Sequence, residues 1–180
     1  GAPIGTAVWK KKQYGIPKHT NVQLLWYRKS LVPVAPKTWD DVLAMSKKLK
    51  SEGKPYVIGL TAAQYEGYVV GFNTILSSLG GTLVNKDSTK VTVDSKTVEA
   101  LGIMKTLATD GSASKSLSNR QEHEVFAQMQ LGEAAFMRTW PYEILAMKSS
   151  DKKGAGGRGD AKRQECKQGE LARATVGGGD

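Results

Sequence analysis

The stretch GEAAFMRTWPYEILAM, residues 132–147, decides the fold of this chain, because it changes from a strand pattern to a helix pattern within three residues. Residues 134–138 have the composition of a short strand, and a helix is expected to start at Pro141. Proline suits the first turn of a helix, where a missing N–H costs no hydrogen bond. Trp140 and Tyr142 flank this proline, so two aromatic rings stand where the strand ends and the helix begins.

The two rings admit two interpretations that the residues alone leave about equally open. Large aromatic side chains commonly fill a core. They also form flat platforms in ligand sites, and open α/β sheets bind ligands at the edge where their strands end. The choice separates an ordinary α/β domain from a binding protein.

Short strands alternate with amphipathic helices along the rest of the chain, and this alternation predicts an α/β fold. Further strands are expected at 22–27 and 56–61. Helices are expected at 38–53, 66–79, 94–110 and 122–131. Residues 81–93 are expected to form an excursion with a hairpin-like turn.

The first long helix carries a full set of start and stop signals. Thr38 is the expected N-cap, Asp41 stands at the capping-box position, and Gly53 ends the helix. Trp39 lies on the apolar face and is expected to be a buried anchor. The positions expected on apolar helix faces are Trp39, Val42, Leu43 and Leu49, then Val69, Phe72, Ile75, Leu76 and Leu79, then Val98, Leu101, Met104 and Leu107.

The length of 180 residues allows one good core or two small ones. Hydrophobic residues make up 39% of the chain and charged residues 24%, which is typical of a globular protein. No apolar run approaches the roughly 20 residues of a membrane span, and no signal peptide is visible.

The net charge of +9 argues weakly for nucleic-acid binding. Most of the excess positive charge lies in residues 1–50, which contain ten lysines and arginines but only two acidic residues, Asp40 and Asp41. Lys47, Lys48 and Lys50 stand in the last turn of the expected helix, where cations complement the helix dipole. No reader motif is present, so we expect no nucleic-acid partner.

Residue types that carry catalysis or metal binding are scarce. Cys166 is the only cysteine, which rules out a disulfide framework and a thiol-rich metal site. His19 and His123 lie far apart and lack metal-ligand spacing. No phosphate loop or nucleophile elbow occurs. We therefore expect no enzyme activity, no metal and no cofactor.

The order of these segments resembles the family 1 extracellular solute-binding proteins of ABC transporters, in the sugar-binding group. Six pieces carry the resemblance, in the family's order: YGIPKHTNVQLLWYRKSL, PKTWDDVLAMSKKLK, YEGYVVGFNTILSSLGGTL, KVTVDSKTVEALGIMKTLATDG, FAQMQLGEAAFMRTWPYEILAM and the closing ATVGGG. Such proteins have two α/β lobes that close on a ligand. The resemblance implies a periplasmic-binding-protein-like lobe, one lobe of a two-lobe clamp, supplied by the middle portion of the family's chain.

The resemblance also implies a division of the chain. Residues 1–30 correspond to an inter-lobe crossing and the first strand, residues 31–150 to the second-lobe domain, and residues 174–180 to the start of the next crossing. Residues 151–173 depart from the family: they are rich in glycine, lysine and arginine where a buried strand and a proline loop are usual. Shifting the reading frame by one nucleotide over 155–168 permits Val-Gly-Val-Ala-Met-Pro-Asn-Gly-Lys. Our hypothesis is a frameshift there, which would make Cys166 an artefact.

The resemblance further implies the residues that touch the ligand. In the family an aromatic after the strand commonly stacks on the sugar, and Trp140 and Tyr142 are the matching positions. Glu66 and Tyr68 match the turn at which the family often uses a polar residue to bind sugar hydroxyls. The helix dipole alone would also explain an acidic residue such as Glu66 at the start of a helix. Asn21, near the first crossing, and Gly178, where backbone could approach the ligand closely, complete the set; a simple turn and a flexible terminus are the respective alternatives.

The function implied is capture of a sugar or oligosaccharide outside the cytoplasmic membrane, in the periplasm or lipid-anchored at its outer face, for delivery to ABC permease subunits. A polyol or glycerophosphodiester is the alternative ligand. A carbohydrate-active enzyme would need two carboxylates across a cleft, and Glu66 with Glu143 is the pair to test. Strand edges left without neighbours predict self-association of the isolated lobe.

Overall fold

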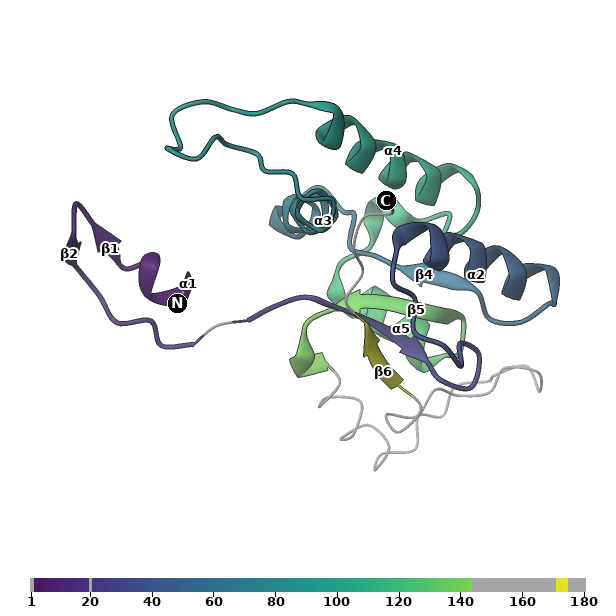
Figure 1. The fold of residues 1–180 in the computed structure, drawn as a ribbon. Helices are drawn as coiled ribbons and strands as arrows, with labels where there is room; N and C mark the ends of the chain where they lie inside the picture. Colours follow the sequence, from purple (N-terminus) through teal and green to yellow (C-terminus); the bar gives the residue numbers. More distant parts are fainter. Residues whose placement is uncertain (1, 20, 144–170, 175–180) are drawn as a thin grey trace.

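The structure is a computed structural model of the chain, and it describes residues 2–19, 21–143 and 171–174 (Figure 1). The predicted α/β fold is confirmed. The strands of the main sheet are β3 (Leu24–Arg28), β4 (Val57–Gly59), β5 (Ala134–Thr139) and β6 (Leu171–Ala174). The helices are α2 (Trp39–Ser51), α3 (Glu66–Ser78), α4 (Ser95–Thr109), the short 3₁₀ turn η1 (Leu117–Asn119) and α5 (Glu122–Gln130).

The sheet has the strand order β4-β5-β3-β6. β4 and β5 run parallel, whereas β3 is antiparallel to both of its neighbours, β5 and β6. The pairing of Leu24 with Thr139 and of Gly59 with Met137 sets the register. The carboxyl ends of β4 and β5 therefore lie at the same edge as the amino end of β3. The expected strand at 22–27 begins two residues later, because Val22 is exposed and unpaired with β5.

A β-bulge interrupts the pairing of β4 with β5. Val57 pairs with Ala134 and Ile58 with Phe136, so Ala135 is an extra residue on β5. Ala135 and Phe136 both join the core cluster on one side of the sheet, while Ala134 and Met137 join the cluster on the other side. Strict alternation of side chains is therefore broken at Ala135.

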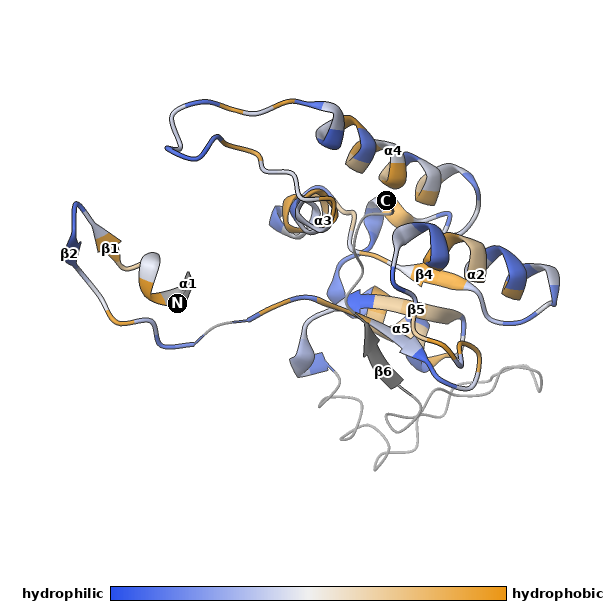
Figure 2. Ribbon diagram, in the orientation of Figure 1, coloured by the Kyte–Doolittle hydropathy of each residue, from blue (hydrophilic) through white to orange (hydrophobic). Residues whose placement is uncertain are grey.

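The sheet lies between two layers of helices (Figure 1). The larger core packs α2, α3 and α4 on one face, and the smaller core packs α5 on the other. The larger cluster includes Leu25, Tyr27, Trp39, Val42, Leu49, Ile58, Ile75, Leu76, Leu107 and Phe136. The smaller one includes Val125, Met129, Ala134 and Met137, with Trp26 and Phe126 packed against it. Figure 2 shows apolar residues in β4 and β5 and a mixture of polar and apolar residues along α2 and α4.

Helix α2 begins and ends as its sequence predicts. The Thr38 hydroxyl accepts from the Asp41 N–H at 3.1 Å, and Asp41 Oδ2 accepts from the Thr38 N–H at 3.0 Å, which confirms the capping box. Gly53 follows with a positive φ of 65°. Trp39 is buried, as predicted, and its Nε1–H donates to Ser78 of α3 at 3.0 Å. The cap of α2 therefore also fixes its packing against α3.

Helices α3 and α4 also form where predicted, with Asp94 capping α4. The expected burial of three apolar positions on them is wrong: Val69, Val98 and Leu101 are more than half exposed. Small residues, Thr97 and Ala100, take the packed positions of α4 instead. The predicted hairpin-like turn at 81–93 is present as a single bridge between Val84 and Val91.

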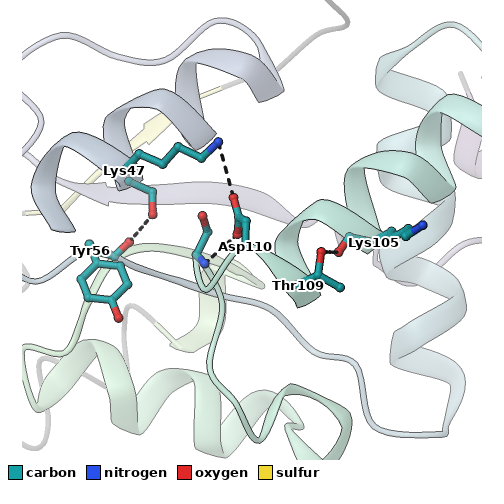
Figure 3. Close-up of polar contacts among 7 residues, drawn as sticks. Lys47, Tyr56, Lys105, Thr109 and Asp110 are labelled. Atoms are coloured by element: carbon teal, nitrogen blue, oxygen red, sulfur yellow. Dashed lines mark hydrogen bonds and ion pairs between the residues drawn. The ribbon is translucent and has the colours of Figure 1, made fainter. Parts of the chain in front are cut away.

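Polar contacts join α2 to its neighbours near the amino end of β4, at the opposite end of the sheet from Trp140. Figure 3 shows Lys47 of α2 reaching Asp110, which follows α4, with 3.9 Å between Nζ and Oδ2. Ser46 donates a 2.9 Å hydrogen bond to the carbonyl of Tyr56, just before β4. These contacts hold α2 to both β4 and α4.

Residues before β3 form a separate small unit. It consists of α1 (Ala2–Gly5) and a hairpin of β1 (Val8–Trp9) with β2 (Lys12–Gln13), and Figure 1 shows it standing apart from the sheet. Among the described residues, no helix is both long and apolar enough to cross a bilayer. The stretch 155–168 and Cys166 lie outside the described residues, as do the closing residues 175–180.

Candidate functional site

The sheet topology gathers the predicted ligand residues at one edge. Trp140 follows the last residue of β5, Glu66 begins the helix that follows β4, and Asn21 stands three residues before β3. Since β4 and β5 are parallel and β3 runs against them, all three positions belong to the same edge of the sheet. This is the edge at which open α/β sheets hold ligands.

The turn at Trp140 leaves one aromatic ring exposed at the surface. The Trp140 carbonyl accepts from the Glu143 N–H at 3.2 Å, so the chain enters its next helix directly after β5. Trp140 is half-buried, whereas Tyr142 is 51% exposed. Tyr142 is thus free of the core, while Trp140 is only partly available to a ligand.

The other predicted residues are placed less uniformly. Glu66 and Asn21 are exposed, and Asn21 Oδ1 accepts from the Val22 N–H at 3.1 Å. Tyr68 is 42% exposed and lines a hollow between α3 and α4. Gly178 lies outside the described residues.

Two carboxylates and two tyrosines meet beside this edge. The Tyr65 hydroxyl donates to Glu122 Oε2 at 2.7 Å, and the Thr139 hydroxyl donates to Glu143 Oε2 at 2.6 Å. Burial, with Glu122 as its acceptor, raises the pKa of Tyr65. Partial burial and the charges of Glu143 and Glu122 raise the pKa of Tyr142. The edge therefore combines aromatic surface with strong hydrogen-bond acceptors.

Glu143 is a buried member of this group. Only 3% of it is exposed, and burial raises the pKa of its carboxyl, although the Thr139 hydrogen bond opposes that change. Charge on Glu122 acts in the same direction as burial. A carboxylate held in this way supports the turn rather than facing an open cleft.

Metal-binding side chains do not cluster at this edge in the described part of the chain. Among residues 2–19, 21–143 and 171–174, no three His, Cys, Asp or Glu side chains gather closely enough to hold a metal ion. The groups that this edge presents are aromatic rings, hydroxyls and carboxylates.

Arg138 is a buried residue of β5. Its alternation with Met137 along the sequence is compatible with a solvated side chain, but only 2% of Arg138 is exposed. Its Nη2 donates to Thr74 Oγ1 at 2.7 Å, to the Val70 carbonyl at 3.1 Å and to Gln23 Oε1. The bulge at Ala135 places it on the α3 side, and a bulge of this kind leaves no clear mark in the sequence AAFMRT.

Comparison with known proteins identifies what the fold resembles. A profile of the family described as bacterial extracellular solute-binding protein matches residues 2–159. A probable ABC transporter-binding protein of Deinococcus radiodurans is 30% identical over 178 residues, covering 93% of this chain and 42% of that protein. A putative binding protein of Brucella abortus is 26% identical over 145 residues, covering 77% of this chain and 35% of its own length.

Solved structures agree with these relatives. Maltose-bound MalE3 of T. maritima aligns with 98% of this chain and 43% of its own, at 27% identity and a TM-score of 0.76. A solute-binding protein of Thermotoga lettingae bound with α-D-tagatose shares the fold, at 22% identity, a TM-score of 0.76, and coverage of 98% and 44%. The chain thus spans about two fifths of the length of the proteins it matches, and the predicted resemblance is confirmed.

Proposed function

Because this chain belongs to the family of bacterial extracellular solute-binding proteins, we propose that it supplies one wall of the site with which an ABC importer's binding protein holds a sugar or oligosaccharide. The likeness to maltose-bound MalE3, at 27% identity, supports a sugar rather than another small solute. The ligand would be captured outside the cytoplasmic membrane by closure of two lobes and passed to permease subunits.

The observation that carries this proposal is the exposed ring of Tyr142 at the sheet edge. A sugar presents apolar C–H faces and polar hydroxyl edges, so its site needs flat rings beside convergent hydrogen-bonding groups. The ring of Tyr142 offers the flat surface, and burial with the charges of Glu143 and Glu122 raises its pKa. The same edge therefore carries both a ring and carboxylate acceptors.

We assign roles to the predicted residues on this basis. Tyr142, with the exposed part of Trp140, stacks on the sugar. Glu66 accepts from sugar hydroxyls, and its place at the start of α3 leaves its carboxylate exposed. Tyr68 and Asn21 are proposed as flanking contacts, and Gly178 as a backbone contact.

Binding without turnover is the expected behaviour. A glycosidase would need Glu66 and Glu143 as its pair of carboxylates. The two differ in exposure: Glu66 is exposed, whereas Glu143 is buried and accepts a hydrogen bond from Thr139. A chromogenic glycoside incubated with the chain should release no product. Product release that is lost in Glu143→Gln would overturn the assignment as a binding protein.

Self-association of the chain is a separate expectation. The outermost strands of the sheet are β4 and β6. The outer side of β4 is partly covered, because the Ile58 N–H donates to the Ser112 carbonyl at 2.8 Å. At the other side of the sheet, the outermost strand β6 pairs with β3 only, as far as the described residues extend. We propose association through β6 and expect sedimentation velocity to show a concentration-dependent dimer; a monomer throughout would argue against it.

Tryptophan fluorescence tests the sugar site directly. The chain is titrated with a panel of disaccharides and oligosaccharides, alongside Trp140→Ala, Tyr142→Ala and the control Tyr14→Ala, which removes an exposed ring from the region before β3. We expect saturable binding of one sugar. Loss of a stacked ring should weaken it about three- to tenfold, as the worth of an aromatic contact suggests.

The control should bind like the parent chain. The same titrations are then made on a full-length solute-binding protein that carries this sequence, because a second wall adds affinity. Saturable binding there that does not change in Trp140→Ala and Tyr142→Ala would refute the platform. Absence of binding to every sugar in the full-length protein would refute the sugar assignment.

A further inference from the structure

A hollow of about 270 Å³ opens between α3 and α4, with the buried Arg138 in its wall. Its walls come from α3, α4, η1, β5 and the segment after β4. We call it the α3–α4 hollow; it is lined by Leu60, Thr61, Ala62, Tyr68, Gly71, Ile75, Leu101, Met104, Lys105, Leu107, Ala108, Leu117 and Arg138. Apart from the mouth residue Tyr68, none of these is among the residues proposed for the sugar.

The lining of the hollow is mostly apolar, and its charged residues are positive. Most of its side chains are aliphatic or methionine, and the two ionisable cations are Arg138, which is buried, and Lys105, which is exposed on α4. Among the residues that the structure describes, no acidic side chain lines the hollow. A hollow of this composition disfavours a cation and favours an anion with an apolar body.

Arg138 enters the hollow without a charged partner. In the described part of the chain its hydrogen-bond acceptors are all neutral, namely Gln23, Val70 and Thr74, and all three bond to Nη2. Its Nε is buried and has no acceptor within the described part of the chain. Burial lowers the pKa of Arg138 to about 10, so the group remains charged at neutral pH.

A buried cation that lacks a counter-charge is costly, and buried charges are normally paired. The fold nevertheless keeps space beside this one. An alanine methyl at Gly71 would lie 3.3 Å from Arg138 Nη1, so the glycine leaves that nitrogen uncrowded. An incoming anion would supply both the missing charge and the missing acceptor.

We propose that the α3–α4 hollow is a second binding site, which takes a small carboxylate carrying an unbranched apolar tail. The carboxylate lies at Arg138 and the tail lies along Ile75, Leu101 and Met104. The volume is just below the roughly 300–1,000 Å³ of pockets for drug-sized ligands, so the tail is of medium length. This site shares only Tyr68 with the sugar site, so either proposal can fail without the other.

Calorimetric titration of the chain with sodium octanoate tests the proposal. Octan-1-ol and octylamine carry the same tail with a neutral and a cationic head group. Octanoate should bind at least tenfold more tightly than octan-1-ol, as a charge-assisted hydrogen bond implies, and octylamine should bind weakest. Equal binding of octanoate and octan-1-ol, or no binding of octanoate, would overturn the proposal.

Variants at the mouth separate the site from a general effect on folding. Leu101→Asp adds a negative charge at an exposed position of the lining and should weaken octanoate binding more than threefold. Val98→Asp adds the same charge on α4, at an exposed position outside the lining, and should bind like the parent chain. Equal weakening by both variants would show that the hollow is not the site.

Arg138→Met removes the head-group contact and should equalise octanoate and octan-1-ol. If that variant does not fold, Lys105→Met on the exposed face of α4 serves in its place, with a smaller loss for octanoate and none for octan-1-ol. An unchanged preference for octanoate in Lys105→Met together with unchanged binding in Leu101→Asp would refute the assignment.

Discussion

The hydroxyl of Tyr65 donates a 2.7 Å hydrogen bond to Glu122 Oε2, across 57 positions of sequence. The bond joins the segment after β4 to the first residue of α5, which packs on the opposite face of the sheet from α3. The Ala62 and Ala63 N–H groups also donate to the Arg120 carbonyl, at 3.0 and 3.1 Å. Two segments of the candidate edge are thus held together by three hydrogen bonds.

Tyr65→Phe should lower the free energy of unfolding by about 1–2 kcal/mol, because a partly buried carboxylate loses its donor. Urea denaturation followed by circular dichroism measures the change. Tyr14→Phe, at an exposed ring, controls for the loss of a phenol hydroxyl and should stay within about 0.5 kcal/mol of the parent chain. Equal values for the two variants would show that the bond to Glu122 adds no stability.

Gly67→Ala should disturb the same bond by a steric route. A methyl group at Gly67 would overlap the ring of Tyr65, which cannot move without leaving Glu122. Gly102→Ala is the matched change, because Gly102 lies in α4 with nothing within 4 Å of the added methyl. We expect thermal unfolding to show loss of stability for Gly67→Ala and a gain of roughly 0.5–1 kcal/mol for Gly102→Ala. A gain in both would contradict the packing of Tyr65.

Glu143 should make the chain less stable as the pH rises. Burial raises the pKa of its carboxyl in the folded state above the ordinary value of 4.5, so the folded chain holds the proton more tightly than the unfolded chain. Its favourable contribution is complete below pH 4.5 and is lost as the pH rises through the folded pKa. Glu143→Gln should therefore gain stability relative to the parent chain across that interval.

Denaturant midpoints between pH 4 and 8 measure this difference. Glu99→Gln on the exposed face of α4 controls for the change in net charge. A gap between Glu143→Gln and the parent chain that stays constant with pH, or narrows as the pH rises, would contradict the direction assigned to Glu143.

Neighbouring residues of α2 should differ in their contribution to stability (Figure 3). Ser46 is fully buried and donates to the Tyr56 carbonyl, so Ser46→Ala should cost about 1–2 kcal/mol. Lys47 is mostly exposed and 3.9 Å from Asp110, so Lys47→Ala should cost at most about 0.5 kcal/mol. Chemical denaturation of the two variants compares them; a larger loss for Lys47→Ala would reverse this ranking.

Local signals in the sequence were sufficient for the longer helices α2 to α5, but not for α1 and η1. Thr38 with Asp41, and Asp94 at the start of α4, act within three residues of themselves, so their spacing fixes where a helix starts. The edge position of Trp140 and Tyr142 also followed from the strand-to-helix junction. Their role in ligand binding stays a prediction.

Features that depend on distant partners could not be predicted. The burial of Arg138 depends on Thr74 and Gln23, which come from other elements, and on the bulge opposite β4. The exposure of Leu101 and Val98 is similar: the spacing of apolar residues on α4 favours them for the core, but the buried positions of α4 are Thr97, Ala100 and Leu107.

The extra residue at Ala135 has a consequence for any change in the length of β5. Deleting either alanine of the pair 134–135 would restore regular alternation, so either the residues before the bulge or those after it must change sides of the sheet. If the residues after it changed sides, residues 136–139 would lose their present pairing with β3, and the guanidinium of Arg138 would face Val125 and Met129. The extra alanine thus decides which side chains of β5 share a face of the sheet, and with the pairing to β3 it places Arg138 on the face covered by α3.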